Sequence, residues 1–179
     1  MSFRNLLFTL SLVGILAVFS GQALAQDVQF LHIIDGDSLV VVAKGDSVTI
    51  RLLGVDAPER GQEYGKKATI FSLKFCYGKQ IRLEFDRRRK DRYGRTLAYV
   101  YADGALLNTA LIQAGLALAT PVKPNTKYAS LFKKTEENAK KEKQGFWRCG
   151  GLKKTPAQWR KKHRYSSKKW IKKTDALFP

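Results

Sequence analysis

Residues 35–59 read DGDSLVVVAKGDSVTIRLLGVDAPE, and this stretch decides the expected fold and chemistry. Two strand-like runs, at 38–43 and 47–53, are joined by Lys44-Gly45-Asp46, a composition typical of a hairpin turn. Acidic residues stand at both ends of the hairpin, in a chain with 33 Lys+Arg and only 15 Asp+Glu. Carboxylates gathered inside so basic a protein indicate a hard metal ion working next to a polyanion.

Outward from this hairpin, the sequence predicts five strands and three helices. Residues 38–43 are rich in β-branched side chains, apolar and charged residues alternate in 80–85, and apolar residues recur at helical spacing in 63–77. Strands are expected at 28–34, 38–43, 47–53, 80–85 and 96–101, and helices at 63–77, 108–114 and 128–143. Asn108 is expected to cap the second helix. The order βββ-α-ββ-α-α predicts an α+β, mainly β fold, namely a five-stranded barrel of the OB type with three helices.

The first 25 residues have the pattern of a secretory signal peptide. Arg4 supplies the positive charge, a run of 14 largely apolar residues follows at 6–19, and Ala23-Leu24-Ala25 fits a cleavage site. The alternative is a membrane anchor, although the run is shorter than the roughly 20 residues that span a bilayer. We therefore expect export to the periplasm or the extracellular medium, and no stable membrane insertion after cleavage.

The remaining chain divides by composition into residues 26–149, expected to form one domain, and a basic tail at 150–179. The whole chain carries a formal net charge of +18, and the tail alone carries ten Lys/Arg against one acid, Asp175. Trp159, Tyr165 and Trp170 are interleaved with these charges, a pattern that suits stacking on bases and neutralising phosphates. A solvated tail that binds any polyanion weakly also fits this composition. We expect both descriptions to hold, with an accessory tail that is partly ordered near Trp159 and has no sequence specificity.

Two cysteines, Cys76 and Cys149, remain after cleavage. In an oxidising compartment they could form a disulfide, and the alternative is two buried thiols. The two histidines, His32 and His163, are isolated, and no Cys/His cluster has the spacing of a zinc site.

The hairpin, together with Arg95 farther along the chain, supplies residue types that suit phosphodiester hydrolysis. Asp37 and Asp56 offer hard oxygen ligands for Ca²⁺ or Mg²⁺, and Glu59 could act as general base on a water beside the metal. Arg51 and Arg95 could clamp a phosphate and offset the charge that grows in its transition state. Each motif alone is weak, but metal ligands, base and charge clamp together form a complete set.

With these residues in view, the sequence resembles the staphylococcal nuclease (thermonuclease) family. The resemblance covers about residues 28–148, and it is carried by the motifs at 34–38, 51–59, 64–65, 91–95, 97–104, 107–108, 113–117 and 141–147. It implies an OB barrel with three helices and Ca²⁺-dependent hydrolysis of DNA and RNA with little sequence specificity. A monomer is expected.

The resemblance also implies roles for individual residues. Asp37 and Asp56 would bind calcium together with the main-chain carbonyl of Ala57. Glu59 would be the base or the group that orients the water, and Arg51 and Arg95 would contact the scissile phosphate. Tyr93 would lie beside the bound nucleotide.

The sequence departs from the family pattern in three places. Ala57 replaces a frequent threonine, the loop from Glu59 to Tyr64 is shortened, and Thr120-Pro121-Val122 lacks the tyrosines that stack on the base. Two other functions lead to different expectations. A non-catalytic nucleic-acid-binding module of the same fold would be expected to lack one or more of Arg51, Glu59 and Arg95. A cationic polypeptide acting on membranes would need a long amphipathic helix, which Gly150-Gly151 and Pro156 are expected to interrupt.

Overall fold

The structure is a computed structural model that describes residues 25–163. The predicted leader, apart from Ala25, and the tail residues Tyr165 and Trp170 lie outside the described residues. Among residues 25–163, no helix is both long and apolar enough to cross a membrane.

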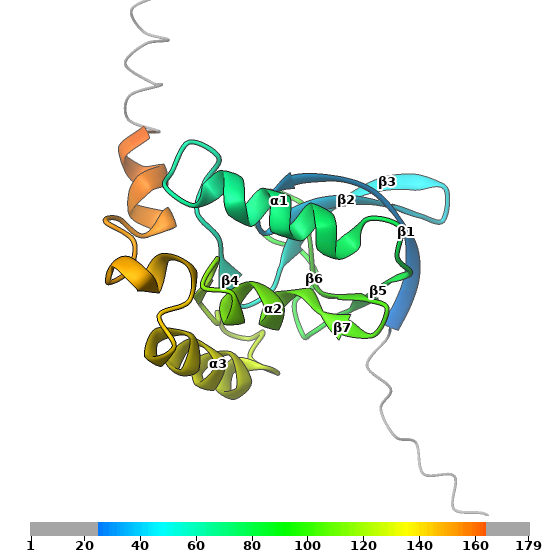
Figure 1. Cartoon of the computed structure of the whole chain (residues 1–179). Coiled ribbons are helices and arrows are strands. Elements are labelled where there is room, and N and C mark those ends of the chain that lie inside the picture. The colour runs from blue at the N-terminus through cyan, green and yellow to red at the C-terminus, as the bar shows by residue number, and fades with distance from the viewer. Residues whose placement is uncertain (1–24, 164–179) are drawn as a thin grey trace, which may run out of the picture.

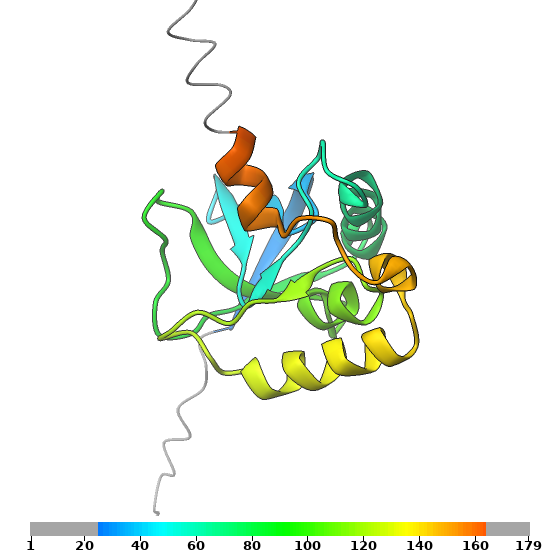
Figure 2. The ribbon, with the colours of Figure 1, turned by 90° about the vertical axis from the view of Figure 1, so that its left-hand side faces the viewer.

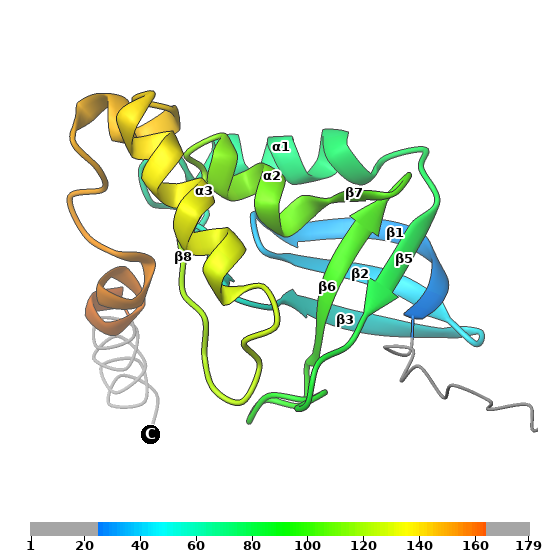
Figure 3. The same ribbon diagram turned by 90° about the horizontal axis from the view of Figure 1, so that it is seen from below.

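Five strands close into a barrel because the first strand pairs on both sides. β1 (Ala25–Asp35) pairs antiparallel with β5 (Ile81–Glu84) along its first half and with β2 (Ser38–Ala43) along its second half. The register against β2 shifts twice, and such bulges bend a strand. β3 (Asp46–Leu52) pairs antiparallel with β2 and parallel with β6 (Thr96–Ala102), which pairs with β5 and completes the ring (Figure 3).

The predicted fold class is confirmed, with more helical structure than expected. The three expected helices are α1 (Gly65–Cys76), α2 (Leu107–Gln113) and α3 (Ala129–Lys141). A 3-10 helix η1 (Gly145–Cys149) follows α3, and residues 156–163 form a further helix. α1 packs on β1, and α3 packs on α2 (Figure 1). Short pairings add β4 (Val55–Asp56) with β8 (Leu118–Ala119), and β7 (Ala105–Leu106) with β6.

Asn108 does not cap α2, contrary to the expectation. The helix begins at Leu107, and no side chain caps it. Asn108 is instead fully buried: its amide donates to the Leu53 carbonyl at 2.7 Å, and its carbonyl accepts from the Val100 amide at 3.1 Å. One polar side chain thus satisfies two backbone groups in the buried interior, where unpaired ones would be costly.

The core lies inside the barrel and beneath the helices, and the two cysteines stand in different environments. Cys76, at the end of α1, is buried in the core, while Cys149, in η1, is exposed. Both are free thiols, so the disulfide considered from the sequence is not formed in this structure. Burial raises the pKa of the Cys76 thiol to about 12, which makes it an inert packing residue.

The helix over residues 156–163 begins with a capping box that sequence analysis missed. The Thr155 hydroxyl accepts from the Gln158 amide at 3.2 Å, and the Gln158 side chain accepts from the Thr155 amide at 2.9 Å. Pro156 occupies the first helical position, where its missing N–H costs nothing. The proline therefore starts this helix rather than interrupting it.

Candidate active site

Asp37 is held by the turn between β1 and β2. This turn has no room for a side chain at Gly36, where a Cβ atom would lie 2.7 Å from the Cβ atoms of Ala57 and Ala68. The buried Ser72 hydroxyl of α1 donates to the Gly36 carbonyl at 2.6 Å. The Asp-Gly-Asp turn is therefore pinned between α1 and the segment after β4.

Asp56 is held by the short pairing of β4 with β8. β8 is tied to α3 because the Glu136 carboxylate accepts from the Ala119 amide at 2.9 Å. The next residue, Ala57, is buried, and its amide donates to Asp37 Oδ2 at 2.7 Å. This contact joins the two carboxylate segments, which stand about twenty residues apart in the chain.

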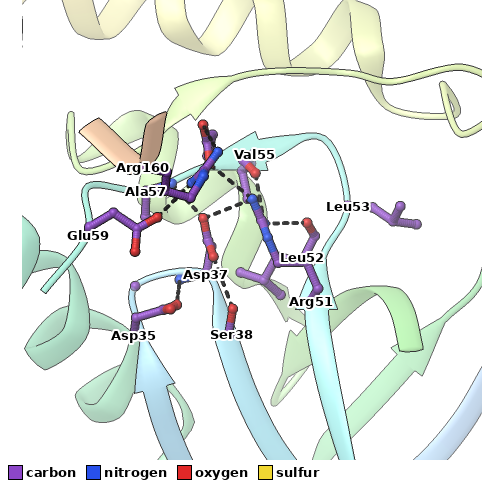
Figure 4. A network of polar contacts seen from close by, with 12 residues as sticks. Asp35, Asp37, Ser38, Arg51, Leu52, Leu53, Val55, Ala57, Glu59 and Arg160 are labelled. Atoms are coloured by element: carbon purple, nitrogen blue, oxygen red, sulfur yellow. Dashed lines mark hydrogen bonds and ion pairs between the residues drawn. The ribbon is translucent and has the colours of Figure 1, made fainter. Parts of the chain in front are cut away.

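Arg51 lies between the two aspartates and holds them together. Its Nη2 is 3.1 Å from Asp37 Oδ2 and 3.1 Å from Asp56 Oδ1. Its Nη1 donates to the carbonyls of Leu52 at 2.8 Å and Val55 at 2.9 Å (Figure 4). Two carbonyls and two carboxylates thus fix the plane of the guanidinium.

Glu59 stands on a tight turn after β4. The Gln62 amide donates to the Glu59 carbonyl at 2.8 Å, and a Cβ atom at Gly65 would lie 1.8 Å from that carbonyl oxygen. The first residue of α1 must therefore be glycine for the turn to pack against the helix. The Glu59 side chain remains partly exposed, and in Figure 4 it extends toward Asp37.

Arg95 and Tyr93 lie on the loop before β6. Asp91 organises this loop: its carboxylate accepts from the amides of Tyr93 and Arg95 and pairs with Arg95 Nε at 2.8 Å. Burial alone would raise the pKa of Asp91, but the hydrogen bonds from Arg95 and from the Tyr93 amide lower it below its ordinary value. Tyr93 is largely exposed, and the guanidinium of Arg92 lies 4.8 Å from its ring centre.

Five of the residues predicted from the sequence meet in one cleft of about 460 Å³. These are Asp37, Arg51, Glu59, Tyr93 and Arg95. Asp56 lines the adjoining part of the cleft, which also reaches Thr120 and Val122. Val122 is exposed there, so an aliphatic side chain occupies the stretch from which the family tyrosines are missing.

The carboxylates of this cleft fit a divalent cation. Burial raises the pKa of Asp37 above its ordinary value; Arg51 opposes this shift, and the charges of Asp35 and Asp56 add to it. A hard cation would relieve that repulsion, and carboxylate oxygens are the ligands it prefers. Within residues 25–163 no three His, Cys, Asp or Glu side chains gather as a metal cluster. The expected donor set contains only two such side chains, Asp37 and Asp56, beside the main-chain carbonyl of Ala57.

The structure adds one residue to the site that sequence reasoning missed. Arg160, in the helix over residues 156–163, places Nη1 2.9 Å from Asp56 Oδ1 and 2.7 Å from Glu59 Oε1. Its Nη2 lies 3.1 Å from Asp56 Oδ2. This helix stands at the barrel end that carries the segment after β4 (Figure 2). Partial order near Trp159 was expected from the sequence, but the helix start at Thr155-Pro156, the one local signal for this helix, was missed.

Comparison with known proteins agrees with the geometry. The family described as Staphylococcal nuclease homologue (SNase) matches residues 49–149. The chain is 38% identical to the thermonuclease of Staphylococcus hyicus over 128 residues, which are 68% of this chain and 76% of the relative. It is 40% identical to the thermonuclease of Staphylococcus intermedius over 122 residues, 65% of this chain and 73% of that protein.

A longer protein is also similar to this chain. The SPbeta prophage-derived endonuclease YokF of Bacillus subtilis (strain 168) is 40% identical over 133 residues, which are 70% of this chain and 45% of the relative. The match therefore spans less than half of that longer protein. Because the family match covers more than half of this chain and the relatives' identity extends over most of it, the chain belongs to the staphylococcal nuclease family.

Proposed function

We propose that this nuclease is exported and cleaves the phosphodiester bonds of DNA and RNA in a calcium-dependent reaction with little sequence specificity. The proposal rests mainly on the position of Arg51. It bridges Asp37 and Asp56 in a cleft that Glu59 and Arg95 also line. The proposed metal ligands, base and phosphate clamp would thereby be close enough together to act on one bound phosphate. The names of the relatives, thermonuclease and endonuclease, support the same reaction class.

Each side chain has a distinct part in the proposed reaction. Asp37, Asp56 and the Ala57 carbonyl would hold the calcium ion, which when bound supplies positive charge to the phosphate and its attacking water. Glu59 takes a proton from that water or orients it. Arg51 and Arg95 offset the negative charge that grows on the phosphoryl oxygens. Tyr93 stands at the rim, where a nucleotide would lie.

Export is supported by the leader pattern of residues 1–25. The expected cleavage after Ala25 falls on the first residue of β1, so it would remove one strand residue and leave the rest of the pairing in place. The alternative, a non-catalytic binding module, is disfavoured because it would be expected to lack one or more of Arg51, Glu59 and Arg95, and all three are present.

The test uses the mature protein, residues 26–179, with single-stranded DNA, duplex DNA and RNA, in calcium or in excess chelator. Cleavage should require calcium, and Asp37→Asn should reduce it at least about 100-fold at ordinary calcium concentrations, because one of two carboxylate ligands is lost. Asp46→Asn, which removes the same charge from the exposed hairpin, is the control and should stay active. Full cleavage in chelator would refute the calcium role.

A further inference from the structure

We propose that Arg160 is a third active-site guanidinium, which contacts the substrate phosphate when a metal ion occupies Asp56. The proposal rests on the function proposed above and deepens it. Its starting point is that residues 150–163, here called the C-terminal segment, supply a guanidinium to the two carboxylates assigned as metal ligand and base.

The C-terminal segment is anchored to the barrel at points that do not involve Arg160. The Gln62 side chain donates to the Lys154 carbonyl at 2.6 Å, and the Glu63 carboxylate accepts from the Lys153 amide at 2.6 Å. Trp159 joins Gln62, Glu63 and Lys154 in lining a small cavity beside these contacts. The capping box at Thr155 then fixes the direction of the helix that carries Arg160. The backbone of Arg160 should therefore stay at the cleft whatever its side chain binds.

In the present geometry Arg160 and a metal ion would compete for Asp56. Arg160 contacts both oxygens of that carboxylate, while Arg51 shares Oδ1. A divalent cation on these oxygens would weaken the bidentate pair with Arg160, because the two cations repel each other and compete for the same oxygens. The guanidinium would then keep its 2.7 Å contact with Glu59 Oε1 through Nη1, and Nη2, which now binds Asp56 Oδ2, would be free for another anion.

The anion available in that position is the substrate. Arg160 lines both parts of the cleft, together with Arg51, Arg92 and Arg95, so its side chain already borders the volume in which a phosphate would lie. A planar guanidinium suits the bidentate recognition of phosphate oxygens. Arg160 would then reach the phosphate from the helix over residues 156–163, whereas Arg95 would reach it from the loop before β6.

The experiment compares full mature wild type with Arg160→Ala, Arg160→Lys and the control Lys161→Ala, which removes the same charge from an exposed neighbouring position. Two quantities are measured: calcium affinity without substrate, by isothermal titration calorimetry, and kcat/KM on an oligonucleotide too short to reach far along the tail. Arg160→Ala should bind calcium about two- to fivefold more tightly, because a competing cation is gone from a partly exposed site. Its kcat/KM should fall roughly 10- to 100-fold, the range expected for lost hydrogen bonds to a charged group.

Tighter calcium binding together with a lower kcat/KM distinguishes this role from a structural one, because a damaged fold would weaken both. Arg160→Lys should recover little of the rate because it cannot contact phosphate bidentately, and Lys161→Ala should match wild type in both measurements. The proposal is overturned if Arg160→Ala keeps wild-type kcat/KM, or if calcium affinity and rate fall together while the fold is intact by circular dichroism. If wild type itself shows no calcium-dependent cleavage, the proposed function fails, whatever calcium affinity the Arg160 variants show.

Discussion

At the scale of single residues, the site depends on carboxylates whose charge is offset by arginines. Arg51 contacts Asp37 and Asp56, Arg160 contacts Asp56 and Glu59, and Arg95 contacts Asp91 outside the carboxylate group. Each arginine is thus positioned by an acid before any substrate arrives. For Arg51 and Arg95 such prior positioning lowers the reorganisation needed when charge develops on a phosphate, whereas Arg160 must first release Asp56.

The first prediction concerns turnover. Glu59→Gln and Arg95→Ala should each lower kcat far more than they change KM, because both groups act mainly while charge and protons move. For Glu59→Gln the loss should be on the order of 10²- to 10⁴-fold, as for removal of a general base. Steady-state kinetics in saturating calcium measures it. A variant with wild-type kcat and a raised KM would show that its assigned role is wrong.

The sequence predicted these residues because their spacing is local. Asp37, Arg51, Asp56 and Glu59 all flank one hairpin, so a 25-residue window contains most of the site. Arg160 lies about a hundred residues farther on, within a run of lysines and arginines that also suits a solvated tail. Nothing in that run distinguishes one arginine from its neighbours, and only the tertiary packing of the C-terminal segment does so.

Two buried polar side chains connect elements that are far apart in the sequence, and each supports a prediction about stability. Asn108 joins α2 to Leu53 and Val100. Asn108→Ala should cost about 2–4 kcal/mol of the free energy of unfolding, because a buried N–H and a buried carbonyl lose their partner. Urea denaturation measures it, with Asn138→Ala on the exposed face of α3 as control. A loss no greater than that of the control would contradict the bridging role.

Glu84 connects β5 to the segment that leads into α3. Its carboxylate pairs with Lys127 and accepts from the hydroxyls of Tyr101 at 2.9 Å and Tyr128 at 3.0 Å. Burial alone would raise the pKa of Glu84, but the hydrogen bonds from Lys127, Tyr101 and Tyr128 lower it below its ordinary value of 4.5. The folded state therefore binds this proton less readily than the unfolded chain does.

The sign of the resulting pH dependence follows from that lowered pKa. The stability that the Glu84 charge contributes is present above about pH 4.5 and is lost as the pH falls through the folded-state pKa. Wild type should consequently be more stable than Glu84→Gln at pH 6, and the difference should shrink at pH 3. Urea unfolding at both pH values measures this, beside the exposed variant Glu142→Gln. A difference that grows on acidification would reverse the assigned sign.

At the scale of the whole molecule, the barrel was predictable from the sequence, but the strand pair that closes it was not. β-branched runs, alternating apolar residues and turn signals place the five main strands to within a few residues of their observed ends. The parallel pairing of β3 with β6, which closes the ring, joins segments with no shared local pattern. The two-residue strands β4, β7 and β8 are too short for any periodicity, and β4 nevertheless positions Asp56.

The last prediction separates the two parts of the basic tail. Residues 164–179 carry five Lys/Arg and one acid, and none of them is assigned to the cleft. A chain ending at His163 keeps Arg160 and the anchors of the C-terminal segment, so its hydrolysis of a very short substrate should barely change. Binding to long single-stranded DNA should weaken, and the slope of log affinity against log salt should flatten by about 0.7 for each lost phosphate contact. Fluorescence anisotropy in chelator across a salt series measures this without cleavage, after circular dichroism has established that the fold is retained. The same affinity and salt slope as for the full mature chain would mean that these charges do not contact the polynucleotide.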